Sequence, residues 1–121
     1  MPSKQLIKLK PGEIWWVELS ISATDSIGHE TKKKRPCIII VNNPQIQMTT
    51  IIPLTSNLSA KNLPDTYLLK RDSQNGLKSD SIALVFQLRS LSYKRYEDKT
   101  GIINNTDLKN IKNLIKNYFG L

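Results

Sequence analysis

The sequence predicts a mainly β domain, built as a small twisted antiparallel sheet or partly open barrel with an amphipathic helix at its C-terminal end. Three patterns predict this fold. Apolar residues alternate at period two after Gly12, a continuous apolar run follows at Cys37–Val41, and the apolar period becomes helical after Thr106. The 121 residues, 39% of them hydrophobic, are typical of one domain, which we expect to span residues 1–121 with a basic arm at 1–10.

The first predicted strand covers residues 13–21. Its odd positions form an apolar stripe of Trp15, Val17, Leu19 and Ile21. Ile14 and Trp16 make one end of the opposite face apolar as well. Residues 22–34 have no period and contain Gly, His, Glu and three lysines, so they predict a long polar loop, a kind of segment that is commonly functional.

The run at Cys37–Val41 suits a strand that is buried on both faces, because no polar residue interrupts it. Three further strands are predicted at residues 47–54, 66–70 and 81–90. A polar loop at 55–64 and turn residues at 72–76 separate them. In the last of these strands, Gln87 and Arg89 fall on the same face.

The C-terminal segment changes to helical spacing. Thr106 is a suitable N-cap, Asp107 favours the first helical turn, and Gly120 suits the position after the last turn. Apolar residues gather on one face while lysines lie outside it: Leu108, Ile111, Ile115 and Tyr118. These features predict one amphipathic helix that packs on the sheet.

The composition excludes several classes of protein. The single cysteine rules out an intramolecular disulfide and a multi-cysteine zinc site, and the single histidine rules out a pair of histidine ligands. No apolar run approaches the ~20 residues that span a bilayer. The basic first ten residues lack the apolar stretch of a secretory signal, so we expect a cytoplasmic protein.

The charge favours a polyanionic partner. Eighteen Lys and Arg against ten Asp and Glu give a net charge of +8, which attracts nucleic acid or an acidic protein. The sequence has no phosphate-binding glycine loop, no serine-nucleophile motif and no close pair of carboxylates for a two-metal nuclease. Asp72 and Asp80 belong to turns and are expected to hydrogen-bond locally. We therefore expect neither a metal nor another cofactor.

Polar groups come before the buried run at Cys37–Val41. His29 titrates near neutral pH, Glu30 adds a carboxylate, and the planar guanidinium of Arg35 suits phosphate. Three lysines precede the arginine: Lys32, Lys33 and Lys34. The plainer alternatives are an exposed loop histidine and a solvated lysine face.

Two more groups of polar residues belong to later strands. Thr55, Ser56 and Asn57 follow the strand at 47–54 and offer two hydroxyls and an amide to a phosphate oxygen, although turn capping uses the same groups. Gln87 and Arg89 lie on the strand at 81–90. A core-facing arginine needs either a carboxylate partner or an opening toward a site.

Taken in order, these segments resemble the PemK/MazF toxins of type II toxin–antitoxin modules. The resemblance runs from about Pro11 to Leu121 and rests on four pieces in register: Pro11–Val17, Gly28–Pro36, Pro53–Asn57 and Asp80–Ser90. It implies an SH3-like barrel and a homodimer. It also implies a metal-independent endoribonuclease that cuts single-stranded RNA at short sequences, arrests growth and is neutralised by an acidic antitoxin, with which it binds DNA as a complex.

By position, the resemblance implies catalytic roles for Arg35 and Thr55, with Ser56 as the neighbouring hydroxyl and His29 and Glu30 as supporting residues of the first loop. RNA would contact a basic groove lined by Trp16, Lys32, Lys33, Lys34, Asn57, Gln87 and Arg89. Bases stack on exposed aromatic rings, for which Trp16 and Tyr93 are candidates. In a symmetric dimer, the apolar patch of Ile14 and Trp16 is a candidate contact between the subunits.

Two positions depart from the family. Phe86 stands where some relatives carry an acidic residue proposed as the general base, and Leu84 replaces a basic residue two positions earlier. We expect the RNA's own 2′-OH to attack the adjacent phosphate and give a 2′,3′-cyclic phosphate and a 5′-OH end, with Arg35, Thr55 and Ser56 stabilising the added charge. Arginine is a poor proton acceptor, which leaves His29 or Glu30 as the base.

The sequence leaves two other functions open. One is a non-catalytic module of the same fold that binds nucleic acid or an antitoxin, an alternative that the loss of the acidic residue at Phe86 favours. The other is a protein-interaction domain whose basic surface only docks an acidic partner.

Overall fold

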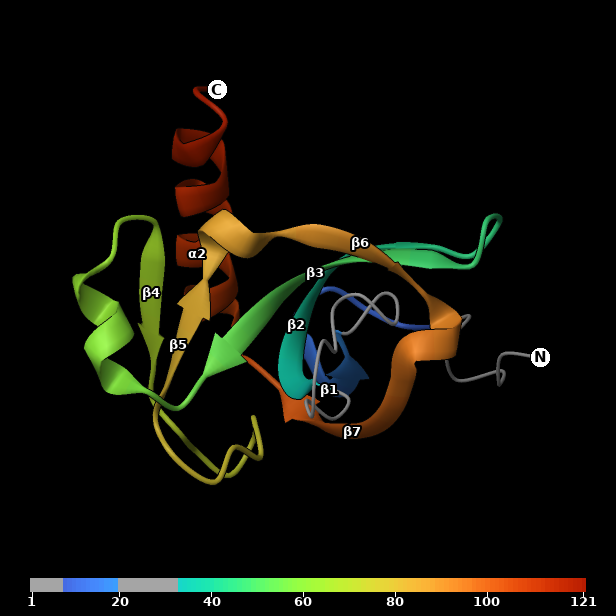
Figure 1. The fold of residues 1–121 in the computed structure, drawn as a ribbon, viewed down its shortest axis with the longest axis horizontal. Helices are drawn as coiled ribbons and strands as arrows, with labels where there is room; N and C mark the ends of the chain where they lie inside the picture. The colour runs from blue at the N-terminus through green and yellow to red at the C-terminus, as the bar shows by residue number, and fades with distance from the viewer. Residues whose placement is uncertain (1–7, 20–32) are drawn as a thin grey trace, which may run out of the picture.

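The computed structural model describes residues 8–19 and 33–121, which form a twisted antiparallel sheet with an α-helix beside it (Figure 1). The strands are β1 (Glu13–Glu18), β2 (Lys34–Asn43), β3 (Met48–Thr55), β4 (Thr66–Leu69), β5 (Ser81–Leu84), β6 (Arg89–Ser92) and β7 (Tyr96–Ile102). The helical elements are the 3-10 helices η2 (Leu58–Asn62), η3 (Val85–Gln87) and η4 (Tyr93–Arg95) and the helix α2 (Asn105–Tyr118). The mainly β fold with a C-terminal helix that the sequence predicts is confirmed.

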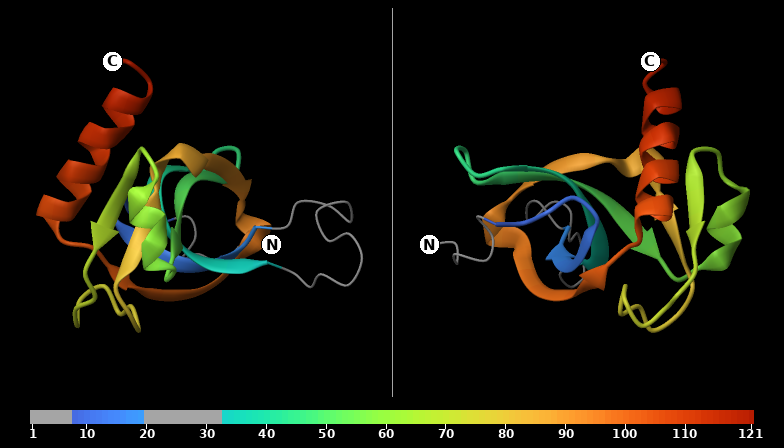
Figure 2. Two further views of the ribbon diagram at one scale, coloured as in Figure 1. Left: turned by 60° about the vertical axis from the view of Figure 1, so that its left-hand side comes forward. Right: turned by 180° about the vertical axis from the view of Figure 1, so that it is seen from behind.

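The strands follow the order β4-β5-β3-β2-β1-β7, and β6 also pairs with β3. Every one of these pairs is antiparallel. The sheet curls strongly, so that β6 and β7 come round to enclose the first strands, as the rotated views in Figure 2 show. β6 and β7 are joined through η4 rather than by a ladder, and the result is a twisted open sheet instead of a closed barrel.

The predicted single strand at residues 81–90 is wrong, because η3 divides it into β5 and β6. Both halves pair with the same edge of β3: Leu54 lies opposite Ala83, and Ile51 lies opposite Arg89. The two registers differ by three residues, which is the length of η3. The inserted turn therefore lets one stretch of chain follow two successive parts of a curving strand.

Other boundaries also differ from the sequence prediction. β7 was not predicted, because its residues Tyr96–Ile102 lack apolar alternation and its middle carries exposed charged side chains. The predicted polar loop at 55–64 contains η2. β1 ends at Glu18, and the last two residues of the strand predicted at 13–21 lie outside the described part of the chain.

The core lies on both faces of the sheet. One cluster lies inside the curl of the sheet and includes Trp15 and Val17 of β1. Its members are Leu9, Trp15, Val17, Leu19, Cys37, Ile39, Ile51, Leu91 and Tyr93. The other lies between the sheet and α2 and includes Ile14, Ile38, Ile52, Leu54, Val85 and Ile111. Cys37, Ile38 and Ile39 are fully buried, as predicted, whereas Val41 at the end of the run is exposed. The burial of Ile14 excludes it as a contact between subunits.

α2 begins at an N-cap different from the predicted one. The Asn104 side chain accepts a hydrogen bond from the backbone N–H of Asp107, so Asn104 is the N-cap and Thr106 lies inside the first turn. Gly120 has a φ of 72°, which fits its predicted place after the helix. The Tyr67 hydroxyl donates to Asp107 Oδ1 at 2.5 Å and fixes the helix start to β4. Among the described residues, no helix has the length and apolar character needed to cross a membrane.

Candidate functional site

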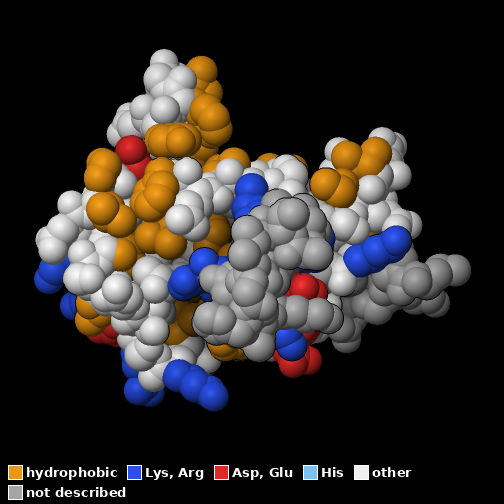
Figure 3. Space-filling view, in the orientation of Figure 1, with side chains coloured by type: hydrophobic (Ala, Val, Ile, Leu, Met, Phe, Trp, Pro, Cys, Tyr) orange, Lys and Arg blue, Asp and Glu red, His pale blue; other side chains and the backbone are white. Residues whose placement is uncertain are grey.

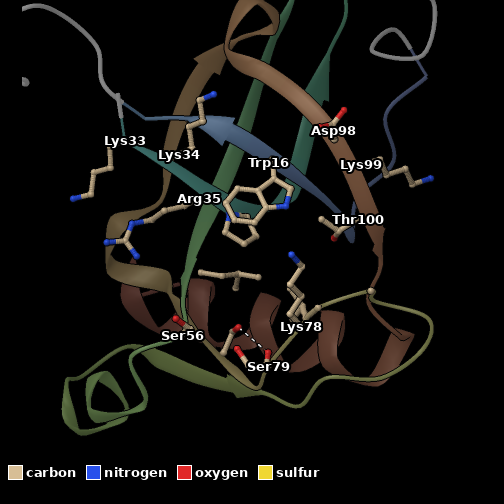
Figure 4. Close-up of a pocket in the computed structure, with 15 residues that line it drawn as sticks. Trp16, Lys33, Lys34, Arg35, Ser56, Lys78, Ser79, Asp98, Lys99 and Thr100 are labelled. Carbon is tan, nitrogen blue, oxygen red and sulfur yellow. Dashed lines mark hydrogen bonds between the residues drawn. The ribbon is translucent and has the colours of Figure 1, made fainter. Parts of the chain in front are cut away.

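A pocket of about 660 Å³ opens where the ends of several strands meet (Figure 4). Trp16 comes from β1, Arg35 from the start of β2, and Ser56 directly follows β3. The opposite wall is formed by residues 76–79 of the turn before β5 and by residues 98–100 of β7. This size is within the range of small-molecule and cofactor pockets.

The indole of Trp16 lies at the centre of the pocket (Figure 4). Strand alternation explains its position, because Trp15 faces the core and Trp16 faces outward with 37% of its surface exposed. Pro36 lies opposite Trp16 in the β1–β2 ladder, and Leu54 and Leu77 add further apolar lining. The pocket therefore offers a flat aromatic surface with an apolar surround.

The pocket is strongly cationic. Its lining contains five basic side chains, Lys33, Lys34, Arg35, Lys78 and Lys99, against the single carboxylate of Asp98. Two of the lysines are paired: Lys34 Nζ lies 2.9 Å from Glu97 Oε2, and Lys99 Nζ lies 3.2 Å from Glu13 Oε2. The hydrogen bond from Lys34 to Glu97 raises the pKa of Lys34.

Arg35 and Lys78 differ from these two lysines in their side-chain partners. Within residues 8–19 and 33–121, no hydrogen bond or ion pair engages either the Arg35 guanidinium or the Lys78 ammonium. The Arg35 side chain extends away from Trp16 toward one edge of the pocket, while Lys78 extends toward Trp16 from the opposite wall (Figure 4). Both cations are available to an anionic ligand.

The register of the sheet brings Arg35 toward Thr55. Ile39 pairs with Ile51 and Cys37 with Pro53, so the same register continued by two residues sets position 35 opposite position 55. At that point β3 leaves β2 and pairs with β5. The next residue, Ser56, lines the pocket together with Arg35. Two segments that are distant in the sequence thus bring the Arg35 guanidinium and the Ser56 hydroxyl to one pocket, whose lining does not include Thr55.

The hydroxyls and amide after β3 are partly engaged in a turn. Thr55 Oγ1 accepts a hydrogen bond from the Asn57 backbone N–H at 3.2 Å. Asn57 Oδ1 accepts from the backbone N–H and the hydroxyl of Ser59, at 3.2 and 2.7 Å, and caps η2. No hydrogen bond of the exposed Ser56 hydroxyl is found among the described residues. The turn-capping alternative considered for this group holds for Asn57 and for Thr55, whose hydroxyl oxygen accepts a backbone N–H of the same turn.

Three other expectations need correction. Tyr93 is only 2% exposed and its hydroxyl donates to Asn42 Oδ1, so the ring is not available to stack on a base. Gln87 lies in η3 and Arg89 begins β6, so they do not share one strand face. Arg89 finds its partner in a backbone group, because its Nη2 donates to the carbonyl oxygen of Leu19 at 3.1 Å.

Cys37 shows that both arginines lie at this end of the sheet. Burial raises the pKa of its thiol to about 12, while the positive charges of Arg89 and Arg35 act in the opposite direction. A thiol in this state is neutral at physiological pH and is not a nucleophile.

The predicted residues His29, Glu30 and Lys32 lie outside the described residues. The sequence prediction missed Lys78, Ser79, Lys99 and Thr100, which line the pocket. Ordinary polar residues in a turn and on an edge strand carry no signal of their own, and only the fold brings them together. In the described ranges, no group of three or more His, Cys, Asp or Glu side chains is arranged to hold a metal ion.

Residues 10–119 match the family described as PemK-like, MazF-like toxins of type II toxin–antitoxin systems. The chain belongs to this family. Among the curated proteins, none matches this chain.

Solved structures share the fold at low identity. MazF from Deinococcus radiodurans is 20% identical with a TM-score of 0.73, and the match covers 93% of this chain and 97% of that one. The Mycobacterium tuberculosis toxin MazF-mt6 is 19% identical with a TM-score of 0.69, covering 93% and 98%. A mycobacterial endoribonuclease solved in complex with its cognate antitoxin is 15% identical with a TM-score of 0.69, covering 93% and 96%.

Proposed function

We propose that this chain is a sequence-specific endoribonuclease toxin that cuts single-stranded RNA without a metal ion. The observation that carries the proposal is the meeting of Arg35 and Ser56, next to Thr55, in one cationic pocket of a chain that belongs to a toxin family. RNA carries its own nucleophile, the 2′-OH, so the protein has only to position the phosphate, stabilise charge and move protons.

In the proposed reaction, the 2′-oxygen forms a bond to the adjacent phosphorus, and the bond from phosphorus to the 5′-oxygen breaks. The products are a 2′,3′-cyclic phosphate and a 5′-OH end. Arg35 donates to the phosphate oxygens as negative charge builds on them, and the hydroxyls of Thr55 and Ser56 add hydrogen bonds to the same oxygens.

Two protons move in this step. A base takes the proton of the 2′-OH, and the leaving 5′-oxygen takes up a proton from water. His29 and Glu30 are the proposed groups for the first transfer, because a guanidinium with a pKa above about 12 holds its protons too strongly. Phe86 is half-buried at the centre of η3 and offers no carboxylate for this purpose.

The test is cleavage of a mixed single-stranded RNA by the purified protein in excess EDTA. We expect cutting at a restricted set of sequences, with cyclic phosphate and 5′-OH ends. Loss of cleavage in EDTA with recovery on adding a divalent metal would contradict the metal-free step.

The second candidate is a non-catalytic module of the same fold, which the absence of a carboxylate at Phe86 favours. Binding of single-stranded RNA without cleavage, both with EDTA and with added metal, would select this candidate. Tight binding of an acidic peptide without any RNA affinity at low salt would instead select a protein-docking domain.

We also propose an acidic antitoxin as the protein partner. The net charge of +8 and the cationic pocket favour an acidic chain segment, and one structurally similar endoribonuclease is solved with its cognate antitoxin. An acidic peptide should compete with RNA for the pocket, and this competition should weaken as salt is raised. Competition that is independent of salt would contradict a charge-driven contact.

We further propose a homodimer. Large exposed apolar side chains gather over α2 and the neighbouring β4 region (Figure 3): Leu58, Leu63, Leu68, Tyr118, Phe119 and Leu121. Exposed apolar areas on a small protein mark contacts with other molecules, and a two-fold dimer buries one such area against its own copy. Phe119→Glu should give a monomer by light scattering with unchanged circular dichroism, and an unchanged dimer would place the contact elsewhere.

A further inference from the structure

The turn between β4 and β5 is built around a buried side chain. Asn75 is fully buried, and its Nδ2 donates to the carbonyl oxygen of Lys70 at 2.9 Å. Its Oδ1 accepts from the backbone N–H groups of Asp72 and Leu77 at 3.1 and 3.0 Å. Because the Asn75 amide spans the turn in this way, residues 70–77 keep one shape.

The same turn is docked against β7 by backbone contacts. A side chain at Gly76 would begin 2.1 Å from the carbonyl oxygen of Thr100, and one at Gly101 would begin 2.3 Å from that of Gln74. Only glycine permits such an approach at these two positions. The Thr100 hydroxyl donates to Asn75 O, and the Ile102 backbone N–H donates to Gln74 O at 3.0 Å.

This docking sets the position of Lys78. The residue follows Gly76 and Leu77 directly, and its side chain extends across the pocket toward Trp16 (Figure 4). Its ammonium group has no hydrogen-bond or ion-pair partner among the described residues. Ser79 and Thr100 add hydroxyl groups to the same wall. A rigid frame therefore holds an uncommitted cation opposite an exposed aromatic face.

We infer that Trp16 and Lys78 form a nucleobase subsite of this pocket, beside the position of the scissile phosphate; the inference rests on the proposed RNA-cleaving function. A base stacks on the indole, as single-stranded RNA does on exposed aromatic rings. Lys78 has three donors and no acceptor, so it selects a base edge that carries acceptors. Guanine presents two adjacent acceptors, O6 and N7, and uracil presents carbonyl oxygens, whereas each acceptor nitrogen at the amino edge of adenine lies beside the donating amino group.

The experiment compares four variants with the native protein on short RNAs that share a mapped cleavage site and differ in one base beside it. Trp16→Leu should raise KM about tenfold and leave kcat nearly unchanged, and Trp16→Phe should recover most of this loss. Lys78→Met should reduce the preference for guanine or uracil over adenine at one position. Lys112→Met, on the exposed side of α2, removes the same charge and should change neither.

A second measurement does not depend on cleavage. An unreactive DNA oligonucleotide should quench the fluorescence of the exposed Trp16, and Trp16→Leu should abolish the quenching while the buried Trp15 still fluoresces. If RNA is cut and the Trp16 and Lys78 variants match the native protein in KM and base preference, the subsite is wrong and the proposed function stands. Quenching that needs Trp16, without any RNA cleavage, would retain the subsite and overturn the nuclease.

Discussion

Arg35 and Arg89 lie at the same end of the sheet, and each opposes the rise in the Cys37 pKa, yet they are used differently. Arg89 donates to the carbonyl oxygen of Leu19 and ties the start of β6 to the end of β1. The Arg35 guanidinium has no partner within the described residues and lines the cationic pocket. An arginine that is bonded to the backbone stabilises the fold, whereas one left unbonded beside hydroxyls is available for chemistry.

The largest effect that this contrast predicts is a loss in the rate of RNA cleavage when Arg35 is replaced by methionine (Arg35→Met). Removing the main donor to the phosphate should slow cleavage by at least about 100-fold. The free energy of unfolding should change by less than about 0.5 kcal/mol, because no bond within the described fold is lost. Single-turnover rates and urea unfolding measure the two quantities. A variant that cuts RNA at the native rate would remove Arg35 from the site.

Replacing Arg35 by lysine sharpens the same point. A lysine keeps the charge but not the planar pair of donors that suits phosphate. Arg35→Lys should therefore recover only part of the rate that Arg35→Met loses, as the same single-turnover assay would show. Full recovery would mean that charge alone acts at this position.

The hydroxyl of Thr55 should matter less. Thr55→Val keeps the shape of the side chain and removes one neutral donor, so cleavage should fall by about 10- to 100-fold. Thr55→Ser, which keeps the hydroxyl, should stay close to the native rate. Equal losses in both variants would show that the hydroxyl, which serine keeps together with its bond from the Asn57 N–H, is not what cleavage requires at this position.

Arg89→Met tests the other half of the contrast. Loss of its bond to Leu19 should lower the free energy of unfolding by about 1–3 kcal/mol. The cleavage rate of the folded variant should stay within about threefold of native. Urea unfolding and single-turnover assays in the absence of urea distinguish the two effects. Unchanged stability with lost cleavage would place Arg89 in the catalytic site.

The last prediction concerns Cys37, whose pKa both arginines influence, and it leaves the cleavage rate untouched. Its folded pKa is about 12, against about 9 for the unfolded chain. Between these values the unfolded chain loses a thiol proton that the folded chain keeps, so the free energy of unfolding should decrease as pH rises above about 9. Burial also raises the pKa of Tyr96, so this group too lowers the free energy of unfolding as the pH rises. Cys37→Ala should make the decrease less steep in unfolding curves recorded across this range.

Local patterns predicted the parts of the fold that bury an apolar stripe. The alternation of Trp15, Val17 and Leu19 and the run at Cys37–Ile39 correspond to buried residues of β1 and β2. The break at η3 carried no such signal, because residues 82–88 are apolar except for Gln87 and only the curvature of β3 requires an insertion. β7 is an edge strand of mixed charge, and its place depends on pairing with β1.

The candidate site was predictable where a residue type carries its own chemistry. Arg35, Ser56 and Trp16 stood out in the sequence, and all three line the pocket. Lys78 did not stand out, since its position depends on how Asn75 and two glycines dock a distant turn on β7. Tyr93 was misread because exposure is set by the curl of the sheet, which closes over its ring.

The most direct test of whether the 2′-OH of the RNA is the nucleophile uses one RNA in which a single 2′-OH is replaced by hydrogen. The substitution is placed at the nucleotide before a mapped cut, and the reaction is run in EDTA on a sequencing gel. Cutting at that step should stop while cuts at other copies of the sequence continue. A cut at the altered step, at the unmodified rate, would show that another nucleophile breaks the chain.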